Sequence, residues 1–135
     1  MTQKEKELVI EDLAARLPYG VRCSYPYGFG TLQSIDLEDM SFTFDCPSDD
    51  NYYEIDGIRP YLRPMSSMTK SERKEFDDLS KFDEDAWMGN HKVGFPKQAR
   101  IMSKCVDWLN KKMFDHRGLI PKGLANVAPE GMYNK

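Results

Sequence analysis

The chain has 135 residues, of which 40% are hydrophobic and 12% aromatic, and its formal net charge is −3. This composition suits one compact domain and excludes wholesale disorder. No apolar run approaches the roughly 18–20 residues that cross a bilayer, and the charged N-terminus lacks the apolar stretch of a secretory signal. We therefore expect a soluble, cytoplasmic protein.

The charge is unevenly distributed along the chain. Residues 1–64 carry six Lys/Arg against twelve Asp/Glu, whereas residues 96–135 carry eight against three. An acidic front half and a basic C-terminal element either attract each other within the fold or serve a partner. The acidic half is expected to be a poor non-specific binder of phosphate backbones.

A first helix is predicted over residues 3–16. Thr2 followed by Glu5 fits a capping box, and apolar residues then recur at helical spacing. Pro18 and Gly20 end the pattern.

Residues 20–64 predict a small antiparallel barrel. Short stretches of alternating apolar and polar residues are separated by clusters of turn-forming residues, and the region holds half of the sixteen aromatic side chains. The alternation changes phase near Gln33 and Ser34, which predicts a β-bulge. Phe42 and Phe44 are predicted to face the core.

The end of this region sets the type of barrel. Tyr52–Ile55 reads as a further strand, and Pro60–Leu62 predicts a brief helical turn before a last short strand. This order of short strands and turns favours an SH3-like barrel. An OB-type barrel is the second choice, because it usually needs longer strands than those predicted here.

Two more helices follow. Thr69 and Glu72 form a second capping-box pattern before a helix predicted over 70–79, and the strongest helix is predicted over 96–114 with Pro96 in its first turn. Residues 115–135 keep enough apolar side chains to predict a packed arm. The fold class is therefore α+β: one domain with an SH3-like barrel, an N-terminal helix, two further helices and a docked C-terminal arm.

No catalytic constellation is evident. The three cysteines include no Cys-x-x-Cys pair, and the two histidines lie far from the cysteines in the sequence. Both observations favour buried thiols over a metal site. Cys105 and His116 are the nearest such pair, and a continued helix would hold them about 16 Å apart. We expect no enzymatic activity, no metal and no cofactor.

Two binding surfaces are predicted instead. Aromatic residues at turns or on the outward face of the barrel (Tyr27, Phe29, Tyr52 and Tyr61) favour a groove for a protein partner, although the C-terminal arm is also a candidate to cover this face. The alternative is nucleic-acid binding by a basic C-terminal surface, comprising Lys104, Lys111, Lys112 and Arg117. A solvated helix surface is the simpler interpretation of those basic residues. The sequence does not specify an oligomeric state.

Several phrases of the sequence are specific enough to suggest a relationship. They are ARLPYGV at 15–21, RPYLRPMSSMT at 59–69, FDHRGLI at 114–120 and APEGMY at 128–133. Together they resemble a family of small uncharacterised proteins of gut anaerobic bacteria, often encoded in prophages and mobile elements. The resemblance spans most of the chain, with residues 45–51 and 80–98 matching least. It implies a phage-related or mobile-element origin and carries over no activity or functional residue.

Overall fold

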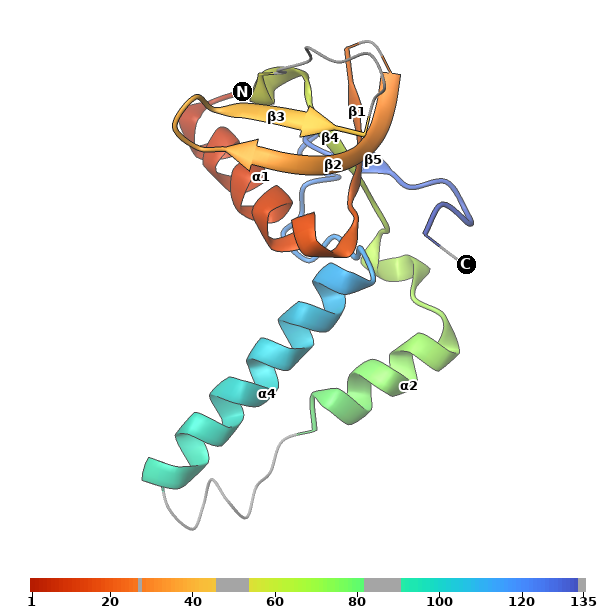
Figure 1. Cartoon of the computed structure of the whole chain (residues 1–135). Helices are drawn as coiled ribbons and strands as arrows, with labels where there is room; N and C mark the ends of the chain where they lie inside the picture. The colour runs from red at the N-terminus through yellow and green to blue at the C-terminus, as the bar shows by residue number, and fades with distance from the viewer. Residues whose placement is uncertain (27, 46–53, 82–90, 134–135) are drawn as a thin grey trace.

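The computed structural model describes residues 1–26, 28–45, 54–81 and 91–133, with only the backbone for residues 91–95. Its described elements combine three α-helices with a five-stranded mixed sheet, which confirms the α+β class. Figure 1 shows a sheet lobe, made of the sheet, the first helix and the C-terminal arm, and a helical lobe below it. Among the described helices, none is both long and apolar enough to span a bilayer.

The sheet is built from β1 (Arg22–Tyr25), β2 (Gly28–Asp36), β3 (Ser41–Phe44), β4 (Arg59–Leu62) and β5 (Asn126–Val127). The strand order is β3-β2-β1-β4-β5, and all neighbours are antiparallel except β4 and β5. Within the described residues the sheet is open, with β3 and β5 at its edges. The predicted SH3-like barrel is therefore not confirmed.

The bulge prediction is confirmed, because the β2–β3 register shifts between Leu32 and Ser34. One extra residue in β2 restores the phase, so that Leu32 pairs with Phe44 and Ile35 with Phe42. Phe42 and Phe44 are both buried in the core, as predicted. The first half of the predicted strand Tyr52–Ile55 lies outside the described residues, and its last residue, Ile55, belongs to a 3₁₀ turn, Ile55–Gly57.

The helical turn predicted at Pro60–Leu62 is wrong, because these residues belong to β4 in the interior of the sheet. Proline lacks the amide hydrogen of a ladder bond, which normally confines it to sheet edges. Here the β1–β4 ladder has only two residue pairs, and Pro60 belongs to one of them. Because a residue has a single backbone N–H, the proline removes at most one hydrogen bond of the sheet.

Helix α1 (Gln3–Arg16) covers one face of the sheet, and the Thr2–Glu5 capping box forms as expected. Val9 and Leu13 are fully buried against side chains from the strands and the arm. The main core thus lies between α1, the inner face of the sheet and the arm. These core side chains are Val21, Cys23, Leu32, Phe42, Ile58, Leu62, Met113, Leu119 and Leu124.

The helical lobe consists of α2 (Lys70–Leu79) and α4 (His91–Lys111). Helix α2 has the predicted bounds, but α4 begins five residues earlier than predicted, which leaves Pro96 inside the helix rather than in its first turn. A second, smaller core holds the two helices together through Trp108, with Phe76 and Leu79 packed against it. The Trp108 indole also donates a hydrogen bond to Glu75 Oε1 at 2.9 Å.

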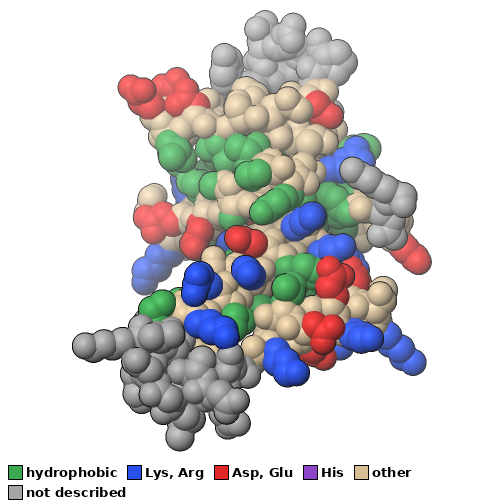
Figure 2. Space-filling view, turned by 60° about the horizontal axis from the view of Figure 1, so that its bottom comes forward, with side chains coloured by type: hydrophobic (Ala, Val, Ile, Leu, Met, Phe, Trp, Pro, Cys, Tyr) green, Lys and Arg blue, Asp and Glu red, His purple; other side chains and the backbone are tan. Residues whose placement is uncertain are grey.

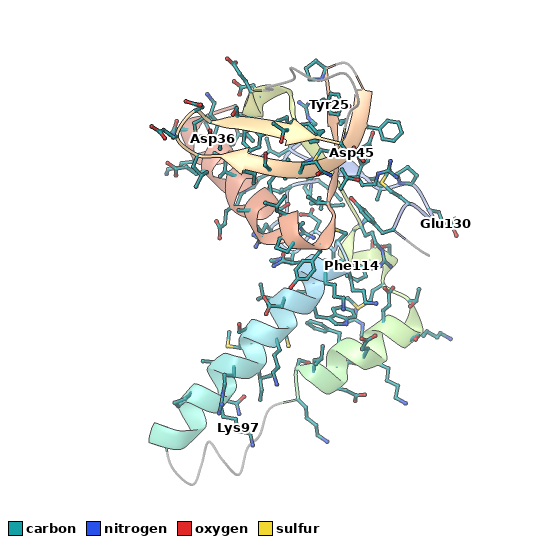
Figure 3. All side chains as sticks on the ribbon, viewed as in Figure 1. Tyr25, Asp36, Asp45, Lys97, Phe114 and Glu130 are labelled. Atoms are coloured by element: carbon teal, nitrogen blue, oxygen red, sulfur yellow. The ribbon has the colours of Figure 1, made fainter. Side chains whose placement is uncertain are left out.

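The helix α4 ends where the arm begins. Met113 adopts a left-handed conformation with φ 65°, and the amide of Phe114 donates to the carbonyl of Leu109 at 2.9 Å. Such a left-handed residue satisfies otherwise free carbonyls at a helix end. Phe114 lies at the junction of the two lobes, as Figure 3 shows.

The C-terminal arm packs along β4. Arg63 exchanges backbone hydrogen bonds with Met113 and Asp115, β5 pairs with β4, and the amide of Ala128 donates to the carbonyl of Leu62 at 2.8 Å. The arm thereby supplies the fifth strand of the sheet.

Candidate binding surface

The outer face of the sheet, opposite α1, carries polar and aromatic side chains. Cross-strand pairing places Phe29 opposite Ser24, and Ser24 opposite Arg59. Since side chains alternate along a strand, Arg22 and Tyr61 lie on this same face. We call it the outer face.

Two of the four predicted aromatic residues meet there. The rings of Phe29 and Tyr61 lie 6.5 Å apart between centroids, nearly perpendicular at 82°. Phe29 is 56% exposed, whereas Tyr61 is half-buried. Tyr27 and Tyr52 lie outside the described residues.

Arg22 joins this aromatic pair from the strand between them. Its guanidinium carbon lies 5.2 Å from the centroid of the Phe29 ring, a cation–π distance. This contact orients an exposed phenylalanine that would otherwise sample several rotamers.

The C-terminal arm covers part of the outer face. The Tyr133 hydroxyl donates to the Tyr61 carbonyl at 2.7 Å and accepts from the Arg22 amide at 3.0 Å. Burial raises the pKa of the Tyr133 hydroxyl. The arm therefore fixes the backbone of β1 and β4 while leaving the Phe29 ring largely open.

A groove of about 690 Å³ runs from the outer face to the helical lobe. Its walls come from the loop before β1, the strands β1 and β2, both helices and the end of the arm. Its charged lining residues are Arg22, Arg63, Glu72, Lys111 and Lys112.

Arg63 and Glu72 close one side of this groove. The Arg63 guanidinium donates to both Glu72 carboxylate oxygens, at 2.7 and 2.8 Å, and lies 4.1 Å from the Phe114 ring centroid. The Arg63 hydrogen bonds hold the pKa of Glu72 at about 2, with the Thr69 amide contributing. This bidentate pair ties the end of β4 to α2.

The four predicted basic residues do not form one surface. Lys111 and Lys112 line the groove, and Lys104 is exposed on α4 outside the groove lining. Arg117 is only 12% exposed, and its guanidinium donates to Asp12 at 2.6 Å and to Asn110 at 3.1 Å. The structure thus directs Arg117 into the fold rather than toward a ligand.

Asp12 is the centre of a buried polar cluster. Its Oδ1 also accepts from Arg16 Nε at 3.0 Å, and both side chains are fully buried. His116 Nε2 lies 2.8 Å from Asn110 Oδ1, and burial, with Arg117 and Arg16 nearby, lowers the pKa of His116 to about 4. This cluster links α1, the end of α4 and the arm.

The chemistry of an activated nucleophile is not supported in the described residues. Cys105 is buried, and desolvation raises its thiol pKa, the opposite of what a reactive cysteine needs. Cys23 is likewise buried with a raised pKa. Across the described ranges, no cluster of three His, Cys, Asp or Glu side chains is suited to a metal ion.

Sequence reasoning missed Arg22 and Tyr133 as parts of this surface. Arg22 alternates with the buried Cys23, so its outward orientation was predictable, but its contact with Phe29 depends on the β1–β2 register. Tyr133 reaches the sheet only because the arm returns along β4, and no local signal encodes that path.

No protein-family model matches the chain, and no curated protein or solved structure is significantly similar to it.

Proposed function

We propose that this protein is a non-enzymatic interaction module that binds a protein partner through the outer face around Phe29 and Tyr61. The observation that carries the proposal is the exposed Phe29 ring, which contacts Arg22 on the adjoining strand and Tyr61 on the strand beyond it. Aromatic and arginine side chains dominate the energetics of protein interfaces. Because the sheet and the arm fix the backbone beneath it, little ordering entropy is lost on binding.

The proposed biological setting is a phage or mobile element, which rests on the sequence resemblance. An interaction module in such a setting needs an exposed surface for its partner. The outer face supplies such a surface.

Substitution of Phe29 tests the proposal. Tagged wild-type protein and Phe29→Ala are used to capture proteins from nuclease-treated lysate of the encoding organism, and retained proteins are quantified by mass spectrometry. The matched control is Leu37→Ala, because Leu37 is 65% exposed at the far end of the β2–β3 hairpin. A partner should be retained by the wild type and the control and lost by Phe29→Ala. Equal retention by all three proteins would reject this surface.

The alternative function is nucleic-acid association through the basic side of α4. The position of Lys111 and Lys112 along the groove favours it. Against it, Figure 2 shows Lys and Arg side chains interspersed with Asp and Glu over the visible face, without a continuous basic track. This alternative predicts salt-sensitive retention on DNA or RNA that Lys111→Ala/Lys112→Ala weakens.

A further inference from the structure

The groove beside the outer face has a net positive charge, because its lining includes more cationic side chains than carboxylates. Four cationic side chains line it, and Glu72 is the single acidic residue among the described lining residues. Glu72 is fully occupied by Arg63 and the Thr69 amide. Within the described chain, Arg22, Lys111 and Lys112 have no carboxylate partner.

Arg22 has hydrogen-bonding capacity that the described chain does not use. Its Nε is buried and has no acceptor among the described residues. A buried donor without an acceptor is unfavourable, and an incoming anion that receives a hydrogen bond from the guanidinium is correspondingly favoured. The same guanidinium packs over Phe29, so the charged and the aromatic features are contiguous.

We propose that the groove binds the carboxylates of an acidic, extended peptide segment of the partner, next to an apolar side chain that packs on Phe29. This inference rests on the proposed function and specifies the chemistry of its partner. Arg22 receives one carboxylate beside the aromatic pair, and Lys111 and Lys112 receive others on the helical side. Charge complementarity of this kind sets the choice of partner and the rate of association.

An acidic peptide fits better than a single-stranded nucleic acid. The Asp45 carboxylate accepts a hydrogen bond from the amide of Thr31, a groove-lining residue, at 2.8 Å, which places negative charge at the sheet end. A peptide can present an uncharged residue at that point, but a polynucleotide carries a phosphate at every step.

The probe is a fluorescein-labelled peptide in which glutamates flank one phenylalanine, titrated with the full chain by fluorescence anisotropy. A peptide with glutamine at the glutamate positions and a labelled oligothymidylate are the comparison ligands. We expect binding of the glutamate peptide alone, weakened by raising the salt concentration. Lys111→Gln/Lys112→Gln and Arg22→Gln should each weaken it about tenfold or more, because each removes a charge partner.

The matched control is Lys70→Gln/Lys74→Gln, which removes the same charge from exposed positions on α2 outside the groove. It should leave the affinity within about twofold, since these exposed side chains lie outside the groove lining and exposed charges are screened. Equal weakening by both double variants would overturn the inference, as would binding of oligothymidylate in place of the peptide, or binding of neither. If Phe29→Ala abolishes partner capture while the lysine variants keep it, the groove inference fails and the proposed function stands.

Discussion

At the scale of single residues, Asp12 makes the most consequential contacts. One of its carboxylate oxygens accepts from two arginines, Arg16 in its own helix and Arg117 in the arm. The acidic front half and the basic C-terminal part of the chain therefore meet inside the fold. This charge asymmetry is in part structural rather than entirely available to a partner.

Asp12→Ala should destabilise the protein strongly. The change leaves two guanidinium groups without their shared carboxylate, one of them fully buried, and breaking a buried ion pair in this way typically costs about 3–5 kcal/mol. Urea unfolding of the variant measures the effect. Glu11→Ala, at an exposed neighbouring position, is the control and should change the free energy of unfolding by less than about 0.5 kcal/mol. A loss below about 1 kcal/mol for Asp12→Ala would contradict the assigned role.

His116 should make stability depend on pH. Its folded-state pKa of about 4 lies below the ordinary value of 6.5, so the unfolded chain binds the proton first as the pH falls. Stability should be full above pH 6.5 and decline toward pH 4, by at most about 1.4 kcal/mol per pH unit. In His116→Gln this decline should be smaller, as measured by urea unfolding at a series of pH values. An unchanged slope would show that His116 titrates normally in the fold.

At the scale of elements, the C-terminal arm fixes the outer face. Tyr133→Phe removes the hydroxyl that bonds the Tyr61 carbonyl and the Arg22 amide. The amide of Arg22 should then exchange with solvent faster, and the free energy of unfolding should fall by about 1–2 kcal/mol. Hydrogen exchange followed by NMR measures this directly. Tyr19→Phe is the control, because Tyr19 is exposed, and it should leave the Arg22 amide unaffected.

The link between β4 and α2 should weaken in acid. Glu72 has its pKa lowered to about 2 by Arg63, so the stabilisation is present above the ordinary value of 4.5 and is lost as the pH falls toward 2. Glu72→Gln should be less stable than the wild type at neutral pH and should show a flatter acid limb. Thermal unfolding between pH 2 and 6 provides the comparison. Identical acid limbs would contradict the assignment.

Elements whose ends or irregularities are marked by nearby residues were predictable. The capping boxes at Thr2 and Thr69 form, and the helices that follow have the predicted bounds. The phase change in the β2 sequence likewise predicted the bulge. In each case the sequence pattern lies within a few residues of the helix start or the bulge that it predicts.

Elements that depend on distant partners were not predictable. Pro60 lies in an interior strand because the arm returns to pair with β4, and that arm supplies the edge strand β5. Helix α4 begins before Pro96, although the preference of proline for the first turn of a helix favours a start at Pro96 itself. The aromatic surface was half predicted: Phe29 and Tyr61 meet, but Arg22 joins them through strand register.

At the scale of the whole molecule, the two lobes meet around Phe114 and Arg63, and the groove lies between them. Sheet residues supply the aromatic part of the candidate surface together with Arg22, and the C-terminal end of α4 supplies Lys111 and the adjoining Lys112. A partner that uses both therefore contacts both lobes.

The central claim, that the Phe29 region is where a protein partner binds, is tested most directly by photo-crosslinking. A photoreactive phenylalanine analogue is placed at position 29 and, in a separate protein, at position 37, which is at least as exposed. After irradiation in cells, position 29 should yield a discrete protein adduct that position 37 does not. The same adducts from both positions, or adducts to nucleic acid alone, would contradict the account.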